Sequence, residues 1–85
     1  MEIKFNASFR KQYGKVDYKI KKSFSKRLKL FQQNPHHPIL RNHILSGNYK
    51  NYRSINITGD WRALYIERGE DIEFEMLGTH SKLYK

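Results

Sequence analysis

The stretch NYKNYRSINITGDWRALYIERGEDIEFEML, residues 48–77, decides the fold of this 85-residue chain. Aromatic and β-branched residues dominate two of its parts, 48–57 and 61–68, and the third, 72–77, alternates apolar and acidic side chains. These patterns are typical of β-strands. The short glycine-containing segments between them are typical of tight turns. We therefore expect three consecutive antiparallel strands joined by hairpins.

The N-terminal part has the pattern of a strand followed by two helices. Residues 1–5 alternate polar and apolar side chains, and between 8 and 33 the apolar residues recur every three or four positions. The second pattern predicts an amphipathic helical stretch, which we expect Gly14 to divide in two. The prolines of NPHHP, 34–38, then end the second helix. The order predicts an α+β fold in which two helices pack on a small antiparallel sheet, with residues 1–85 forming one domain.

The charge of the chain indicates a polyanionic partner. Lys and Arg number 17 against 8 Asp and Glu, a formal net charge of +9, and the excess is confined to residues 1–59. A basic face is expected on the helices, at Lys15, Lys19, Lys22 and Lys26. Nucleic acid is the commonest partner for such a surface. The alternatives are an acidic protein that covers the same lysines and a helix face that is simply solvated.

Cysteine and hydropathy restrict the setting of the protein. The chain has no cysteine, whereas small secreted domains usually need disulfides or a metal, so we expect a cytoplasmic protein. No leader sequence opens the chain, and no apolar run approaches the roughly 18 residues of a membrane-spanning helix. We therefore expect no membrane partner. The histidines His36, His37, His43 and His80 lack the spacing of a metal site, and neither a metal nor another cofactor is expected.

Three residues suited to proton transfer surround the predicted strands. His43 precedes them, Asp60 lies in the first turn and His80 follows the last strand. Short hairpins should bring these side chains onto one surface of the sheet. In RNA, a base can deprotonate the 2′-OH so that it attacks the adjacent phosphate, while an acid protonates the leaving 5′-oxygen, and no metal is required. The plainer alternatives are solvent-facing histidines and an ordinary turn aspartate.

Other residues are candidates for binding the substrate. Arg53 and Arg62, on neighbouring strands, are expected to flank one hollow and stabilise the charge of the reacting phosphate, with Lys50 as a further phosphate ligand. Trp61 and Tyr84 are candidates to stack on an exposed base, a contact worth about 1–3 kcal/mol. The alternatives are arginines that serve as strand-face charges and a tyrosine that covers the core.

The stretch NHILSGNYKNYRSINITGDWRALYIERGEDIEFEMLGTHSKLY, residues 42–84, resembles the second half of the RelE/ParE toxin superfamily, and most closely its YafQ-like branch. The matching elements are His43 to Gly47, Tyr52-Arg53, Asp60-Trp61 with Tyr65, and Gly78-Thr79-His80 with Tyr84. They cover about half of the chain, and the helical half matches only in layout and charge.

The resemblance implies a RelE-like fold and a ribosome-dependent mRNA endonuclease of a type II toxin–antitoxin pair. Such a toxin cuts translated mRNA in the ribosomal A site and is held inactive by a cognate antitoxin, commonly in a heterotetramer. The residues that match the acid–base group are His43, Asp60 and His80, and Tyr84 stands where a functional phenylalanine is usual.

The chain departs from the YafQ-like branch at one position of this group. The branch usually has a histidine four residues before the aspartate of Asp-Trp, and here Asn56 occupies that position. Asparagine does not exchange protons near neutral pH, so Asn56 can serve only as a hydrogen-bonding substitute. Two rival functions remain open: a ParE-like toxin that poisons DNA gyrase without a nuclease centre, and a non-toxic nucleic-acid-binding module.

Overall fold

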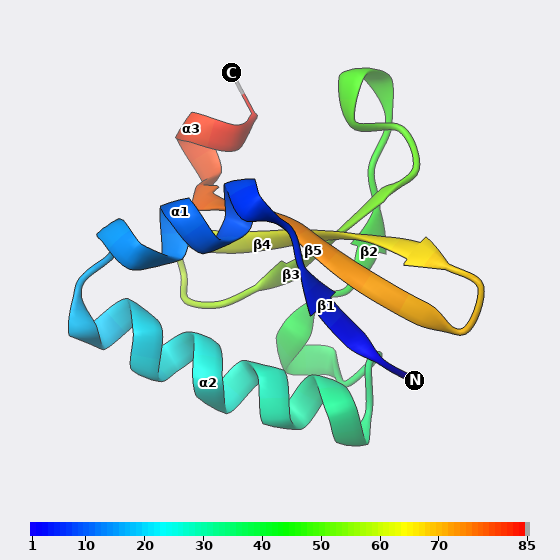
Figure 1. Cartoon of the computed structure of the whole chain (residues 1–85), viewed down its shortest axis with the longest axis horizontal. Helices are drawn as coiled ribbons and strands as arrows, with labels where there is room; N and C mark the ends of the chain where they lie inside the picture. The colour runs from blue at the N-terminus through cyan, green and yellow to red at the C-terminus, as the bar shows by residue number, and fades with distance from the viewer. Residues whose placement is uncertain (85) are drawn as a thin grey trace.

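The computed structural model describes residues 1–84 and shows helices packed on a five-stranded sheet (Figure 1). The elements run in the order β1 (Ile3–Phe5), α1 (Ala7–Lys15), α2 (Tyr18–Gln33), β2 (His43–Ile44), β3 (Tyr52–Asn56), β4 (Trp61–Arg68), β5 (Asp71–Thr79) and α3 (His80–Leu83). Two short 3-10 turns, η1 (Pro38–Leu40) and η2 (Gly47–Tyr49), precede β2 and β3. The predicted α+β class and the hairpin order of the long strands are confirmed.

The sheet is mixed, which differs from the predicted antiparallel sheet. Its strand order is β1-β5-β4-β3-β2, and β1 pairs with β5 in parallel, with Ile3 opposite Ile72 and Phe5 opposite Phe74. A parallel neighbour needs a long connection rather than a hairpin, and the alternating pattern of one strand carries no information about the direction of its neighbour. The two-residue strand β2, on the opposite edge, is likewise too short to leave a pattern.

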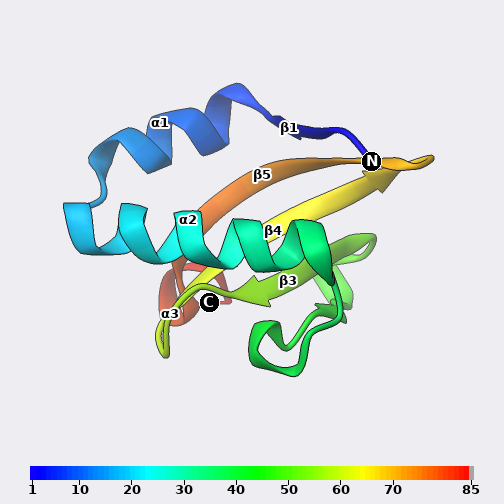
Figure 2. The ribbon, with the colours of Figure 1, turned by 90° about the horizontal axis from the view of Figure 1, so that it is seen from below.

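The two faces of the sheet carry different helices. In Figures 1 and 2, α2 lies on one side of the sheet and α3 on the other. The side chains of Ile55 and Tyr65 belong to the core beneath α2. Because side chains alternate along a strand, their neighbours point to the other side. We call this second side the open face; in the central strands its residues are Tyr52, Ser54, Asn56, Arg62 and Leu64.

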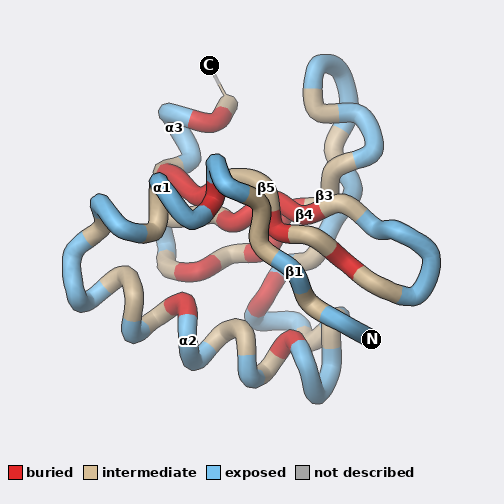
Figure 3. The backbone as a smooth tube through the Cα atoms, in the orientation of Figure 1, coloured by how far each residue is buried: buried red, intermediate tan, exposed pale blue. Residues whose placement is uncertain are grey.

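The core lies between α2 and the sheet, and Figure 3 shows burial concentrated in the strands. Phe31 of α2 is 1 % exposed, and its ring packs edge-on against Tyr65 and Phe74, with centroids 5.1 and 5.8 Å away. Phe24, two helical turns earlier on the same face, meets Phe74 at 5.7 Å. The predicted amphipathic pattern of the second helix is therefore confirmed, since its apolar side faces the sheet.

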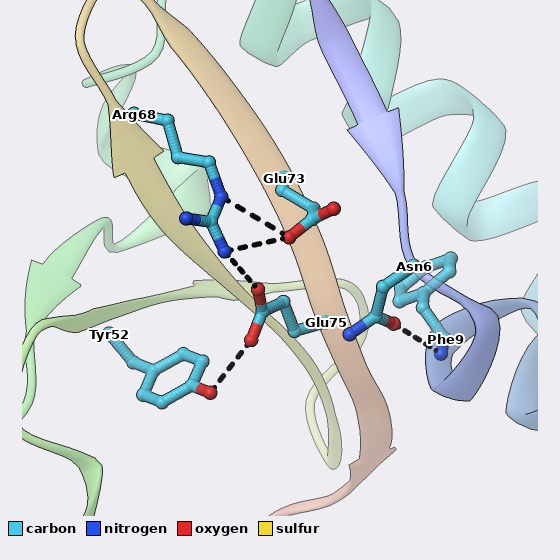
Figure 4. A network of polar contacts seen from close by, with 6 residues as sticks. All are labelled: Asn6, Phe9, Tyr52, Arg68, Glu73 and Glu75. Atoms are coloured by element: carbon cyan, nitrogen blue, oxygen red, sulfur yellow. Dashed lines mark hydrogen bonds and ion pairs between the residues drawn. The ribbon is translucent and has the colours of Figure 1, made fainter.

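Side-chain caps determine where the first two helices begin. Asn6 Oδ1 accepts a hydrogen bond from the amide of Phe9 at 2.8 Å (Figure 4), and Asp17 Oδ1 accepts one from Ile20 at 3.1 Å. The predicted break at Gly14 is wrong: Gly14 lies within α1, and the chain leaves the helix at Val16 because Asp17 caps a new one.

Candidate active site

The tail of the chain carries two of the predicted catalytic residues over the open face. The amide of His80 donates to the carbonyl of Asp60 at 2.8 Å, which fixes the start of α3 to the β3–β4 turn. The hydroxyl of Tyr84 donates to Ser54 Oγ at 2.9 Å. The rings of His80 and Tyr84 meet edge to face, with centroids 4.7 Å apart. The tail, residues 80–84, is thus bonded at its first residue to the β3–β4 turn and at its last residue to β3.

The Gly-Thr pair before His80 sets the course of this tail. Thr79 caps α3, because its hydroxyl accepts a hydrogen bond from the amide of Lys82 at 3.3 Å. Gly78 lets Leu83 approach the strand: a Cβ at Gly78 would lie 3.3 Å from two carbons of the Leu83 side chain. The glycine therefore provides the space into which the tail packs.

His43 lies on the neighbouring edge strand, directly opposite Ser54 in the β2–β3 register. Its side chain is exposed, and its Nδ1 lies 2.7 Å from the carbonyl oxygen of Arg41. A carbonyl only accepts hydrogen bonds, so Nδ1 carries the proton and Nε2 is the free acceptor of the neutral ring. The predicted meeting of His43 and His80 on one face of the sheet is supported by this register, since Ser54 lies between them.

The turn that carries Asp60 is held by an arginine. The guanidinium of Arg62 donates to the carbonyls of Thr58 at 3.0 Å, Gly59 at 3.2 Å and Trp61 at 3.0 Å. The Thr58 hydroxyl accepts from the amides of Asp60 and Trp61 at 3.3 and 3.0 Å. These bonds stiffen the turn, on which Asp60 is exposed. Arg62 lies on the open face, and its guanidinium is hydrogen-bonded to the backbone of the turn.

Arg53 and Arg62 do not flank one hollow, and that prediction is wrong. Arg62 is paired with Asn56 on the open face, whereas Arg53 is paired with Tyr65, whose ring lies in the core. Arg53 Nε donates to Asn42 Oδ1 at 2.9 Å, and Asn42 donates to the Tyr65 hydroxyl at 2.8 Å. Arg53 and Asn56 are an odd number of residues apart, so alternation along β3 places them on opposite faces.

The remaining predicted ligands are distributed around the open face. Asn56 is half-buried there, two residues beyond Ser54, and Lys50 is exposed directly after η2. The same turn supplies Tyr49, whose ring lies edge-on to that of Tyr84 with centroids 6.0 Å apart. Sequence analysis missed Ser54 and Tyr49, because only the register and the return of the tail reveal that they meet Tyr84.

A cleft lies behind the tail and not at the predicted acid–base group. It measures about 680 Å³ and is lined by residues that include Lys15, Trp61, Lys82 and Leu83. Lys82 is two positions from His80 in α3, a rotation of about 200°, so the two side chains leave the helix on opposite sides. Among the predicted substrate-binding residues on strands β3 to β5, Trp61 alone borders this cleft. His43, Asp60 and His80 are exposed, so the acid–base group lies on an open surface.

Three of the four predicted lysines are on the other side of the sheet from His80. Lys19, Lys22 and Lys26 are exposed on α2, whose apolar side faces the sheet, and Lys15 is exposed in the last turn of α1. Figure 1 shows α2 and α3 on opposite sides of the sheet, so the exposed lysines of α2 and His80 of α3 are separated by the sheet. The α2 lysines and the acid–base group are thus on two separate surfaces, whereas Lys15 borders the cleft beside Trp61 and Lys82.

A polar network marks the far end of the open face (Figure 4). Arg68 pairs with Glu73 at 3.1 Å and with Glu75 at 3.3 Å, and the Tyr52 hydroxyl donates to Glu75 at 2.7 Å. This hydrogen bond to a carboxylate raises the pKa of Tyr52 above its ordinary value. The network places acidic groups beyond Tyr52, so the surface available to a polyanion ends there.

Residues 1–84 contain no group of three or more histidine, aspartate or glutamate side chains placed to hold a metal ion. Within that same range, no helix is both long and apolar enough to cross a membrane.

Comparison with known proteins identifies the family. Residues 1–85 match the family described as "Bacterial toxin of type II toxin-antitoxin system, YafQ". The chain belongs to this family. A curated member, the mRNA interferase toxin YafQ of Escherichia coli strain K12, is 33% identical over 46 residues, which is 54% of this chain and 50% of that protein. The chain thus matches about half the length of this relative.

Solved structures of YafQ and related toxins have the same fold. YafQ from E. coli strain BL21(DE3) matches with a TM-score of 0.77 and 23% identity over 99% of this chain and 98% of that one. A YoeB/ParE toxin from Agrobacterium tumefaciens matches at 0.75 and 19%, over 94% and 99% of the two chains. The E. coli DinJ–YafQ toxin–antitoxin complex matches at 0.67 and 25%, over 99% and 97%. The predicted resemblance and RelE-like fold are therefore confirmed.

Proposed function

We propose that this protein is the toxin of a type II toxin–antitoxin pair and a ribosome-dependent mRNA endonuclease. The observation that carries the proposal is the placement of His43 and His80 on one face of the sheet, on either side of the hydrogen bond between Ser54 and Tyr84. The YafQ relative from E. coli is named an mRNA interferase, which supports the same activity.

We assign the general base to His43. Its Nδ1 is held by the Arg41 carbonyl, so Nε2 presents a lone pair to the open face. In the reaction, Nε2 takes the proton of the RNA 2′-OH, and the 2′-oxygen attacks the adjacent phosphorus. The bond from phosphorus to the 5′-oxygen then breaks, which leaves a cyclic phosphate on one product. No metal takes part in these steps.

We assign the general acid to His80, whose protonated imidazole gives its proton to the leaving 5′-oxygen. Asp60 adjoins the start of the tail, where its backbone carbonyl accepts a hydrogen bond from the amide of His80 at 2.8 Å. Arg62 and Lys50 contribute positive charge for the reacting phosphate, and Asn56 contributes a hydrogen bond in place of a titrating histidine. We leave Arg53 out of this group because it lies on the α2 side of the sheet and donates to Asn42.

Substrate bases are expected to stack near the tail. Tyr84 presents an aromatic ring beside His80, and Trp61 presents one behind the tail, beside Asp60. Aromatic side chains hold unpaired bases with little regard to sequence. An open surface of this kind suits a message that is already single-stranded.

The separation of the α2 lysines from the acid–base group supports an activity that depends on the ribosome, because one surface can bind the ribosome while the other meets the message. The lysines of the basic face are Lys15, Lys19, Lys22 and Lys26. In this proposal they bind ribosomal RNA, while the opposite side of the sheet receives the messenger strand. A cognate antitoxin then keeps the toxin inactive, as the DinJ–YafQ complex suggests for a relative. We expect a toxin–antitoxin heterotetramer, in the cytoplasm.

The pH dependence of cleavage on programmed ribosomes tests the two roles. A base must be deprotonated and an acid protonated, so the wild-type rate should rise and then fall with pH. His43→Ala should remove the rising limb and His80→Ala the falling limb. His36→Ala, at an exposed position of the proline loop, is the matched control and should keep both limbs. The role assignment fails if His43→Ala retains the rising limb.

A further inference from the structure

Ser54 is the one buried polar residue in the described part of the chain, at 0 % exposure. It lies in the middle of the open face, opposite His43 on one side and Leu64 on the other. Its hydroxyl receives the hydrogen bond of Tyr84 at 2.9 Å. Burying a serine hydroxyl without a partner costs stability, so Tyr84 and Ser54 each satisfy a polar group of the other.

The helix that carries His80 depends on contacts outside itself. It spans four residues, and at its end the amide of Tyr84 donates to the carbonyl of His80 at 3.0 Å. So short a helix is unstable alone in water. The ring of Tyr84 touches the His80 ring on one side and that of Tyr49 on another, both edge to face. Apolar edge contacts leave the ring free to slide, whereas its hydroxyl bond has a defined direction.

We infer that Ser54 is a positioning residue of the cleavage site: through its bond to Tyr84 it holds the imidazole of His80 over the strand that pairs with His43. Nothing in the family resemblance or in the comparisons assigns a role to Ser54. The inference rests on the proposed function, but the geometry it requires can be tested without RNA.

Two variants remove the bond from either side. Ser54→Ala and Tyr84→Phe each delete one oxygen and leave the strand and the ring in place, and the double variant deletes both. One hydrogen bond is worth about three- to tenfold in an equilibrium, so each single variant should lower kcat of cleavage about three- to tenfold with KM changed less than about twofold. The double variant should be no worse than the poorer single one, because both act through one bond. Ser81→Ala, exposed in the same helix, is the control and should cleave as the wild type does.

Nuclear magnetic resonance of the free toxin supplies the second readout. A tyrosine ring 4.7 Å away shifts the imidazole proton resonances of His80, and this shift should shrink in Ser54→Ala and in Tyr84→Phe but not in Ser81→Ala. A structural role alone would lower the melting temperature without moving these resonances. The inference is overturned if the resonances stay in place, or if the losses of kcat multiply in the double variant. A wild type that shows the ring shift without cleaving RNA would instead refute the proposed function.

Discussion

Replacing Leu83 with alanine should detach the tail and leave the rest of the fold intact. Leu83 is 8 % exposed and packs on Gly78, whereas His80 and Ser81 beside it are exposed. Burial of a leucine side chain contributes about 1.5–3 kcal/mol. A Leu→Ala change at a site that can collapse lies at the low end of the core range, about 2 kcal/mol. That loss lowers the docked-to-undocked ratio of the tail about 30-fold.

Hydrogen exchange and cleavage measure this change together. The amide of Tyr84, bonded to the His80 carbonyl, should exchange up to about 30-fold faster in Leu83→Ala, and kcat should fall because undocking removes His80 from the site. The free energy of unfolding should fall by no more than the lost docking free energy, about 2 kcal/mol, and the amides of the central strands should keep their protection from exchange. Leu28→Ala, at a half-buried position of α2, is the matched control and should lower stability while cleavage at low temperature persists. Unchanged exchange at Tyr84 together with wild-type cleavage in Leu83→Ala would refute the reasoning.

Three further predictions concern separate parts of the molecule. Asn56→His restores a titrating group on the open face and should raise kcat of cleavage on ribosomes; an unchanged pH profile would show that the residue never exchanges a proton. Burial raises the pKa of Tyr65 above its unfolded value of about 10, so the protonated form stabilises the fold; the free energy of unfolding should fall as pH rises beyond 10, and urea titrations of Tyr65→Phe, but not of the exposed Tyr18→Phe, should lack part of that fall. Removing three lysine charges should weaken ribosome binding and leave kcat unchanged. The slope of log affinity against log salt should become about 2 to 3 units less steep. A slope equal to that of the wild type would exclude these lysines as the ribosome-binding surface. The lysines are Lys19, Lys22 and Lys26.

The strands and helices could be predicted because their local patterns are strong. Two of the three long strands are rich in aromatic and β-branched residues, the third alternates, and α2 shows the spacing of a helix with one apolar side. The parallel pairing of β1 and the short strand β2 could not be predicted, because both depend on where distant segments return. The boundary between α1 and α2 is set by Asp17, whose side chain caps α2, and not by Gly14, which α1 accommodates within the helix.

The candidate site was predictable as a set of residue types but not as a geometry. Turn residues and the Gly-Thr-His tail pointed to His43, Asp60 and His80, yet whether they share a face depends on register. Arg53 shows the difference, because its side chain lies on the α2 side of the sheet, opposite to that of the next residue, Ser54. Ser54 carried no signal in the sequence, since a serine in a strand is ordinary until the tail is seen to return above it.

Cleavage of a translated message in cells tests the central claim most directly. The wild type, His80→Ala and His36→Ala would each be induced under tight control in a bacterial host, followed by growth measurement and primer extension on one translated mRNA. We expect the wild type and His36→Ala to arrest growth and produce in-frame cuts, and His80→Ala to do neither. Growth arrest by both the wild type and His80→Ala without any cut in the message would contradict the nuclease and favour a toxin that poisons gyrase.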